Sequence, residues 1–191
     1  PGFVELDVSG HSNICGTNAS GKTTLQRLIP VFYGELPSKV VPKTRKKFDD
    51  YYLPHANSYL IYEYQREDGQ NCQVVLTRKG SDGVQYRFVE APYHQEQILV
   101  DVEKGNVQAM LPEQWIKQLR HLGIEFSHKI QATSEFRSII QNDASVGRGA
   151  GRESTKLRQL ASRYSLVSSQ HRIRHMEKLV SAVHAKEGKM D

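Results

Sequence analysis

Eight consecutive residues near the start of the chain, GTNASGKT at positions 16–23, match the phosphate-loop pattern G-x-x-x-x-G-K-[ST] at every fixed position. In this pattern the glycines let the backbone curl, so that its N–H groups surround phosphate oxygens. The Lys22 ammonium can reach the terminal phosphates, and the Thr23 hydroxyl can bind Mg²⁺. The motif therefore predicts a site for a nucleoside triphosphate, ATP with Mg²⁺. The residues expected to contact the nucleotide are Gly16, Asn18, Ala19, Ser20, Gly21, Lys22, Thr23 and Thr24.

The sequence around the loop has the pattern that this chemistry requires. Residues 3–8 and 11–15 are expected to form two short strands, the second of which leads into the loop. A helix should begin at the loop and end near Pro30 or Gly34. The N–H groups and positive dipole end of that helix would face the phosphates. This context favours a functional loop over a coincidental glycine-rich turn.

A nucleotide hydrolase also needs a carboxylate that organises Mg²⁺ and the attacking water. The nearest candidate is Asp101, which follows the apolar residues 98–100. It lies beside polar residues, and an ordinary surface strand is the more natural interpretation. No guanine-reading N-K-x-D string is present. The chain therefore resembles one half of a nucleotide site.

Further along the chain, the hydrophobic pattern changes to a period of two. Residues 59–64, 72–76 and 84–89 predict three strands, joined at Asp-Gly turns into an antiparallel meander. Residues 112–122 and 133–141 are expected to be helices, and residues 125–131 could form a strand between them. Residues 35–56 read as an irregular loop that carries a basic cluster.

Three segments are expected: a lobe at 1–146, a flexible link at 147–152 and a helical segment at 153–191. The last 45 positions, 147–191, hold 10 Lys and Arg against 4 Asp and Glu, so they carry the positive net charge of +5. This segment could meet a nucleic-acid backbone, or it could be a solvated helix face. Apolar residues at 157, 160, 164 and 167 suit either the start of a coiled coil or packing on the core. His171 and His175 are one helical turn apart but lack a third metal ligand.

Composition narrows the class of protein. The two cysteines, Cys15 and Cys72, have no paired spacing, which is typical of a reduced, cytoplasmic protein. No apolar run approaches the length of a membrane span, and no signal-peptide pattern is present. Since the sequence enters a strand-like pattern at once, without an initiator methionine, we expect a segment of a longer chain.

The strand pair, phosphate loop, meander and late glutamine before a helix together resemble the N-terminal half of an SMC-type (MukB-like) ATPase head. The resemblance implies an α/β P-loop NTPase fold of the ATP-binding-cassette type, with helices leading toward a coiled coil. It implies ATP hydrolysis by the full-length protein, with the signature motif and Mg²⁺ carboxylate supplied by the C-terminal half of the same head. The implied partners are a second copy through ATP-engaged heads, DNA and accessory subunits, in the cytoplasm near the nucleoid and not at a membrane.

Two further site residues follow from this resemblance. Gln131 occupies the place of the glutamine that senses Mg²⁺ and water in the family, although it could be a helix-start glutamine without a ligand. Arg45 belongs to the basic cluster that would lie near the phosphates or DNA, although a solvated loop is the more common outcome. Two other functions remain open at this point: an autonomous P-loop kinase or transferase, and a module that uses ATP only to dimerise.

Overall fold

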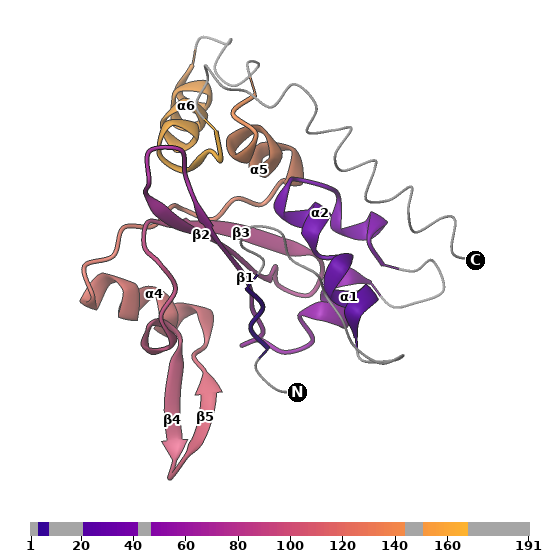
Figure 1. Ribbon diagram of the computed structural model, residues 1–191, viewed down its shortest axis with the longest axis vertical. Coiled ribbons are helices and arrows are strands. Elements are labelled where there is room, and N and C mark those ends of the chain that lie inside the picture. Colours follow the sequence, from indigo (N-terminus) through magenta and orange to yellow (C-terminus); the bar gives the residue numbers. More distant parts are fainter. Residues whose placement is uncertain (1–3, 8–20, 42–46, 144–150, 168–191) are drawn as a thin grey trace.

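A computed structural model describes residues 4–7, 21–41, 47–143 and 151–167 (Figure 1). Its centre is a three-stranded antiparallel sheet in the order β1-β2-β3. The predicted meander is confirmed, and so are its turns, because Gly69 and Gly83 adopt the left-handed φ angles of 85° and 88° that tight turns need. The strands are β1 (Leu60–Gln65), β2 (Asn71–Arg78) and β3 (Val84–Val89).

The sheet is covered on both faces, because alternate residues of each strand point to opposite sides. Val74 and Leu76 of β2 belong to a core with α2, α3, α5 and α6, whereas Val75 joins a second core with α4. Figure 1 shows α4 on the other side of the sheet from α5 and α6. The helices are α1 (Lys22–Gln26), α2 (Ile29–Phe32), α3 (Phe48–Tyr52), α4 (Pro112–His121), α5 (Thr133–Ile140) and α6 (Arg152–Tyr164), with 3₁₀ turns at Pro37–Lys39 and Gln95–Gln97.

The helix predicted to leave the phosphate loop is interrupted. It ends at Gln26 and restarts at Ile29 as α2, so the prediction of one continuous helix is wrong. Pro30 explains the break, because it has no N–H to donate to the carbonyl of Gln26 and its ring would collide with that carbonyl. The same proline suits the first turn of α2, where no N–H is required.

Other predictions need correction in this part of the fold. Residues 35–56 are not an irregular loop throughout, since α3 and a 3₁₀ turn lie within them. Residues 125–131 form only two isolated bridges, Val89 to Phe126 and Tyr86 to Ile130, instead of a strand. Residues 4–7 adopt neither helix nor strand, which contradicts the described part of the first predicted strand. The surface strand predicted at Asp101 is present as β4 (Leu99–Glu103), but its partner β5 (Asn106–Ala109) was missed, and with it the hairpin that projects from the body (Figure 1).

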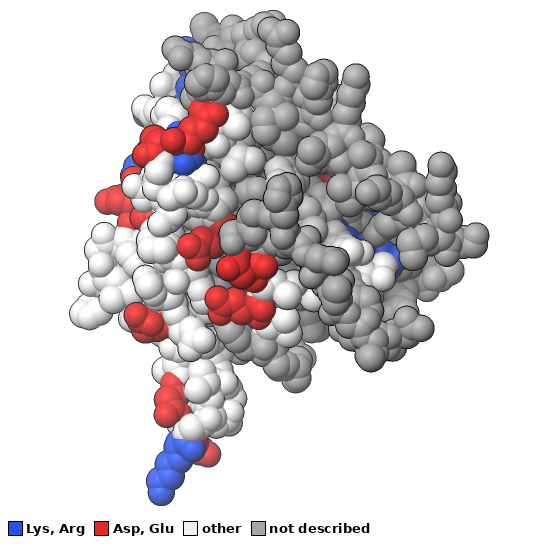
Figure 2. All heavy atoms as spheres, in the orientation of Figure 1, with Lys and Arg blue, Asp and Glu red and all other residues white. Residues whose placement is uncertain are grey.

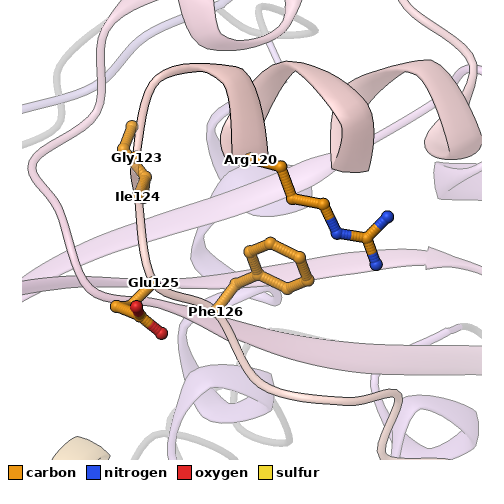
Figure 3. A pocket seen from close by; sticks show the side chains of 5 residues that line it. All are labelled: Arg120, Gly123, Ile124, Glu125 and Phe126. Atoms are coloured by element: carbon orange, nitrogen blue, oxygen red, sulfur yellow. The ribbon is translucent and has the colours of Figure 1, made fainter.

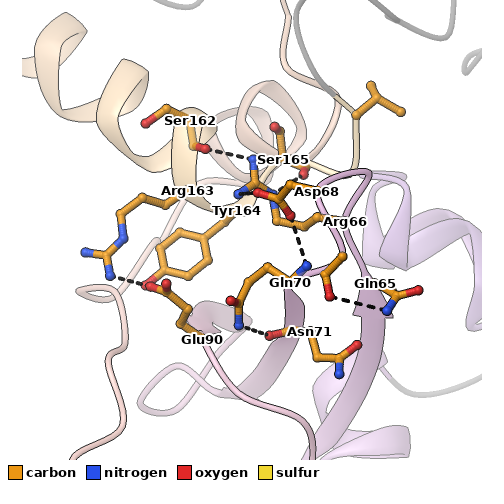
Figure 4. A network of polar contacts seen from close by, with 12 residues as sticks. Gln65, Arg66, Asp68, Gln70, Asn71, Glu90, Ser162, Arg163, Tyr164 and Ser165 are labelled. Carbon is orange, nitrogen blue, oxygen red and sulfur yellow. Dashed lines mark hydrogen bonds and ion pairs between the residues drawn. The ribbon is translucent and has the colours of Figure 1, made fainter.

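Helix α6 packs on the core, which decides between the two interpretations of its apolar stripe. Tyr164 and Val167 are buried, and the Tyr164 ring stacks on Phe88 at a centroid distance of 5.0 Å. The end of the helix is held by Arg66 of the β1–β2 turn (Figure 4), which donates to the carbonyls of Ser162 at 2.7 Å and Ser165 at 3.0 Å. Within residues 152–167 the stripe therefore faces the core.

The helices predicted at 112–122 and 133–141 are confirmed as α4 and α5. Trp115 and Leu119 of α4 are buried against the sheet, while Phe136, Ile139 and Ile140 of α5 are buried on its other face. No helix within the described ranges is long and apolar enough to cross a lipid bilayer.

Candidate functional site

The described part of the phosphate loop begins at Gly21, while residues 16–20 lie outside the described residues. Gly21 has φ 84° and ψ 6°, a left-handed conformation that glycine adopts without a steric penalty. It is the N-cap of α1, and its carbonyl accepts a hydrogen bond from the Leu25 N–H at 3.0 Å. The helix therefore begins at Lys22, the position that the motif requires for its lysine.

The first turn of α1 has no side-chain cap of its own, because its N-cap residue is Gly21, and the turn contains no acidic residue. Thr23 is exposed, whereas Thr24 is half-buried. An anion beside this turn would meet backbone donors and the Thr23 hydroxyl without competition from a carboxylate of the same turn.

Two tyrosines attach this helical region to the rest of the fold. The Tyr52 hydroxyl of α3 donates to the carbonyl of Thr24 at 3.4 Å, and the Tyr62 hydroxyl of β1 donates to the carbonyl of Leu28 at 2.9 Å. Burial raises the pKa of Tyr62 well above its ordinary value, so its hydroxyl stays a proton donor across the physiological range. The region after the phosphate loop is thus held by the sheet and by α3.

Helix α3 is itself held by an ion-pair cluster at the end of the β2–β3 hairpin. The buried Asp49 carboxylate accepts from the Gly83 N–H at 3.1 Å and lies 3.4 Å from the Arg78 guanidinium. Arg78 also pairs with Asp50 at 2.8 Å, and these carboxylates raise the pKa of Arg78. Asp49 and Asp50 therefore serve the attachment of α3 to the sheet.

Gln131 precedes α5, and α5 is bound to the helix that follows the phosphate loop. The Arg137 Nε donates to the carbonyl of Gly34 at 2.7 Å, and the Gln141 amide donates to the carbonyl of Tyr33 at 2.8 Å. Gln131 is exposed, directly after Ile130, which is buried and bridged to Tyr86. The fold connects the helix that follows Gln131 with the end of α2, while the Gln131 side chain is exposed.

Asp101 lies on the projecting hairpin, which pairs with no strand of the central sheet. Its carboxylate accepts from the Gly105 N–H at 3.3 Å and closes the hairpin turn. The interpretation as an ordinary surface strand agrees with this position. Among the residues that the structure describes, no group of three or more His, Cys, Asp and Glu could hold a metal ion. Arg45, Cys15, His171 and His175 lie outside the described residues.

The structural role of Gly34 near the site was not predicted from the sequence. Gly34 was considered only as a helix end, but its φ of 93° coincides with a close approach of α5. A Cβ atom at Gly34 would lie 2.8 Å from the Cβ of Arg137 and 3.0 Å from its Cα. A glycine after an apolar helical run was the available signal, whereas its distant neighbour was not visible in the sequence.

The fold is a small α/β protein with antiparallel sheets, in which a helix begins at the lysine of a phosphate-loop motif. The chain belongs to the family described as "Protein of unknown function (DUF3584)", whose model matches residues 1–191. No curated protein and no solved structure matches the chain.

Proposed function

We propose that the chain binds ATP with Mg²⁺ through residues 16–23 and forms the N-terminal half of an SMC-like ATPase head. The observation that carries this proposal is the complete GTNASGKT motif, which ends in a left-handed Gly21 followed at once by a helix. The Lys22 ammonium binds the β- and γ-phosphates, and the Thr23 hydroxyl is a ligand of Mg²⁺. Arg45 and Gln131 are the proposed auxiliary residues.

The attachments of α1 and α2 support a rigid site. Four side-chain donors bond to backbone carbonyls between Thr24 and Gly34. These donors come from α3, β1, α5 and the residue after α5, and they are Tyr52, Tyr62, Arg137 and Gln141. A phosphate site gains from such preorganisation, because its donors then need no rearrangement when the anion arrives. The contact of α5 with Gly34 also supports a role for Gln131, because it couples the preceding segment to the nucleotide helix.

The position of Asp101 supports the half-site aspect of the proposal. A catalytic carboxylate has to approach Mg²⁺ at the phosphate loop, and Asp101 instead closes a turn on the projecting hairpin. The proposed enzyme is therefore an ATPase whose Mg²⁺ carboxylate and signature motif come from a C-terminal half. ATP binding would engage two heads in a homodimer, with DNA as the polymer on which it acts and with accessory subunits. Hydrolysis would release the heads.

ATP turnover tests this division of labour. The chain is assayed with Mg²⁺ and ATP, first alone and then with the remainder of its natural polypeptide. The proposal predicts no turnover above background for the chain alone and turnover after complementation, abolished by Thr23→Ala. Efficient hydrolysis or phosphate transfer by the chain alone would contradict the half-site and favour an autonomous enzyme. Nucleotide-dependent dimerisation without any hydrolysis after complementation would favour a non-hydrolysing module.

A further inference from the structure

A shallow groove of about 330 Å³ lies between α4 and the β2–β3 side of the sheet. Helix α4 covers only part of this face, because its buried residues Trp115 and Leu119 pack on the apolar half of the sheet. The neighbouring positions of the same face are polar, since Thr77 pairs with Gln85 and Arg87 follows two residues later. The groove's polar and basic lining consists of Thr77, Gln85, Arg87, Lys117, Arg120 and Lys129.

Four of these side chains are cations, and they stand on both walls of the groove. Lys117 and Arg120 come from the exposed side of α4, whereas Arg87 and Lys129 come from β3 and the segment bridged to it. None of the four forms an ion pair within the part of the chain that the structure describes. The acidic lining is limited to Glu113. The groove therefore carries an excess of positive charge, with four cationic side chains against one carboxylate.

The arginines are held in place without a carboxylate. Arg87 is half-buried and donates to the carbonyl of Ser127 at 2.8 Å. Its guanidinium lies 5.9 Å from the centre of the Phe126 ring. The guanidinium of Arg120 lies 5.6 Å from the same centre, and Figure 3 shows Arg120 beside Phe126. Burial and the neighbouring Arg120 lower the pKa of Arg87.

Figure 2 shows one face of the molecule, on which Asp and Glu gather over the body and few Lys or Arg are visible among the coloured residues. Separated patches of opposite sign guide a charged partner to one face of a protein. A polyanion would be attracted to the groove and repelled by the acidic face.

The residues that line the groove favour a nucleic acid over an acidic protein as its partner. Protein partners bind through buried apolar and aromatic anchors, whereas nucleic acids bind mainly through phosphates that meet Lys, Arg and polar side chains. Pro112, Trp115 and Ile116 also line the groove, but Trp115 is buried against the sheet, and none of the exposed large apolar residues of the described chain lies there. Cations on two facing walls also suit a chain of repeated phosphates better than one isolated anion.

We propose that the groove between α4 and the sheet binds the sugar–phosphate backbone of nucleic acid. The inference deepens the proposed function and rests on it for the choice of DNA as the nucleic acid. Lys117 and Arg120 are the outer contacts, and Arg87 with Lys129 forms the opposite wall. The Gln85 amide, which already donates to the Thr77 hydroxyl at 3.1 Å, adds a further polar group to the floor.

The test is fluorescence anisotropy of a short labelled DNA duplex with the full chain at several salt concentrations. The double variant Lys117→Gln/Arg120→Gln is compared with Lys104→Gln, which removes an exposed charge at the tip of the β4–β5 hairpin. Each phosphate contact contributes about −0.9 to the slope of log binding constant against log salt. The double variant should reduce the magnitude of the slope by roughly 2 and weaken binding at least ~10-fold at moderate salt. The Lys104 variant should match the parent chain.

Equal effects of both variants, or an unchanged salt slope in the double variant, would overturn the groove assignment. An acidic peptide of equal charge that binds as tightly and with the same sensitivity to the double variant would also overturn it, in favour of a protein partner. The thermal melting of each variant verifies folding, and Lys117→Gln alone repeats the test if the double variant fails to fold. Mg-ATP binding is measured in parallel: its loss in Lys22→Ala without loss of DNA binding separates failure at the loop from failure at the groove.

Discussion

Replacing Gly34 with alanine should destabilise the packing of α5 against the chain that follows α2. Gly34 has a φ of 93°, which costs an L-residue about 1–2 kcal/mol. The added methyl group would also lie 2.7 Å from the Cγ and 2.8 Å from the Cβ of Arg137. Because the Cβ and Cα of Arg137 cannot rotate away, α5 itself has to shift, at an overpacking cost of about 1–3 kcal/mol. The sum is roughly 2–5 kcal/mol.

Gly69→Ala is the matched control for this prediction. Gly69 has nearly the same φ, 85°, but a Cβ there would meet nothing within 4 Å. Its substitution should therefore show only the backbone cost, about 1–2 kcal/mol. Urea unfolding of the three proteins, followed by circular dichroism, gives the free energies of unfolding. Equal destabilisation by the two substitutions would refute the close approach of α5 to Gly34.

Two further predictions concern the packing of α6 and the buried core. Arg66→Gln removes charge-assisted donors to two carbonyls at the end of α6, so it should lower the free energy of unfolding by about 2 kcal/mol and accelerate amide hydrogen exchange in α6. Arg158→Gln, at an exposed position of the same helix, should do neither. Unchanged hydrogen exchange in the Arg66 variant would contradict the role of these hydrogen bonds. Burial raises the pKa of the Cys72 thiol from 9.0 to about 11 and that of the Tyr86 and Tyr164 hydroxyls from 10.0 to about 12. As the pH rises, the unfolded chain loses these protons before the folded chain does. The free energy of unfolding should therefore be undiminished by these groups below about pH 9 and fall progressively toward pH 12, with a shallower fall in Cys72→Ala between pH 9 and pH 11. A free energy of unfolding that does not change over this range would contradict the burial of these groups.

The elements predicted well from the sequence are those whose signals are local. The meander follows from a period of two with Asp-Gly turns, and α4 follows from Pro112 at its start and Gly123 after its end. The elements predicted poorly are held by distant contacts or have no buried face. Helix α3 depends on Asp49 and its bonds to the β2–β3 hairpin, and the β4–β5 hairpin exposes both of its faces.

The same distinction applies to the candidate site. The phosphate-loop motif consists of consecutive residues, so the motif alone predicted a helix that begins at Lys22 after a turn at Gly21. The hydrogen bond from Arg137 to the carbonyl of Gly34 joins residues 103 positions apart, so no local sequence pattern predicts it. The groove beside α4 was missed for a related reason. Its cations are scattered between Arg87 and Lys129, and only the packing of α4 on the sheet brings them to one surface.

Isothermal titration calorimetry of Mg-ATP into the chain measures directly whether GTNASGKT binds ATP with Mg²⁺. Lys22→Ala is compared with Lys104→Ala, which removes the same charge from the projecting hairpin. We expect saturable binding by the parent chain and the Lys104 variant, and loss of binding in Lys22→Ala. Absence of binding by the folded parent chain, or equal binding by all three proteins, would contradict it.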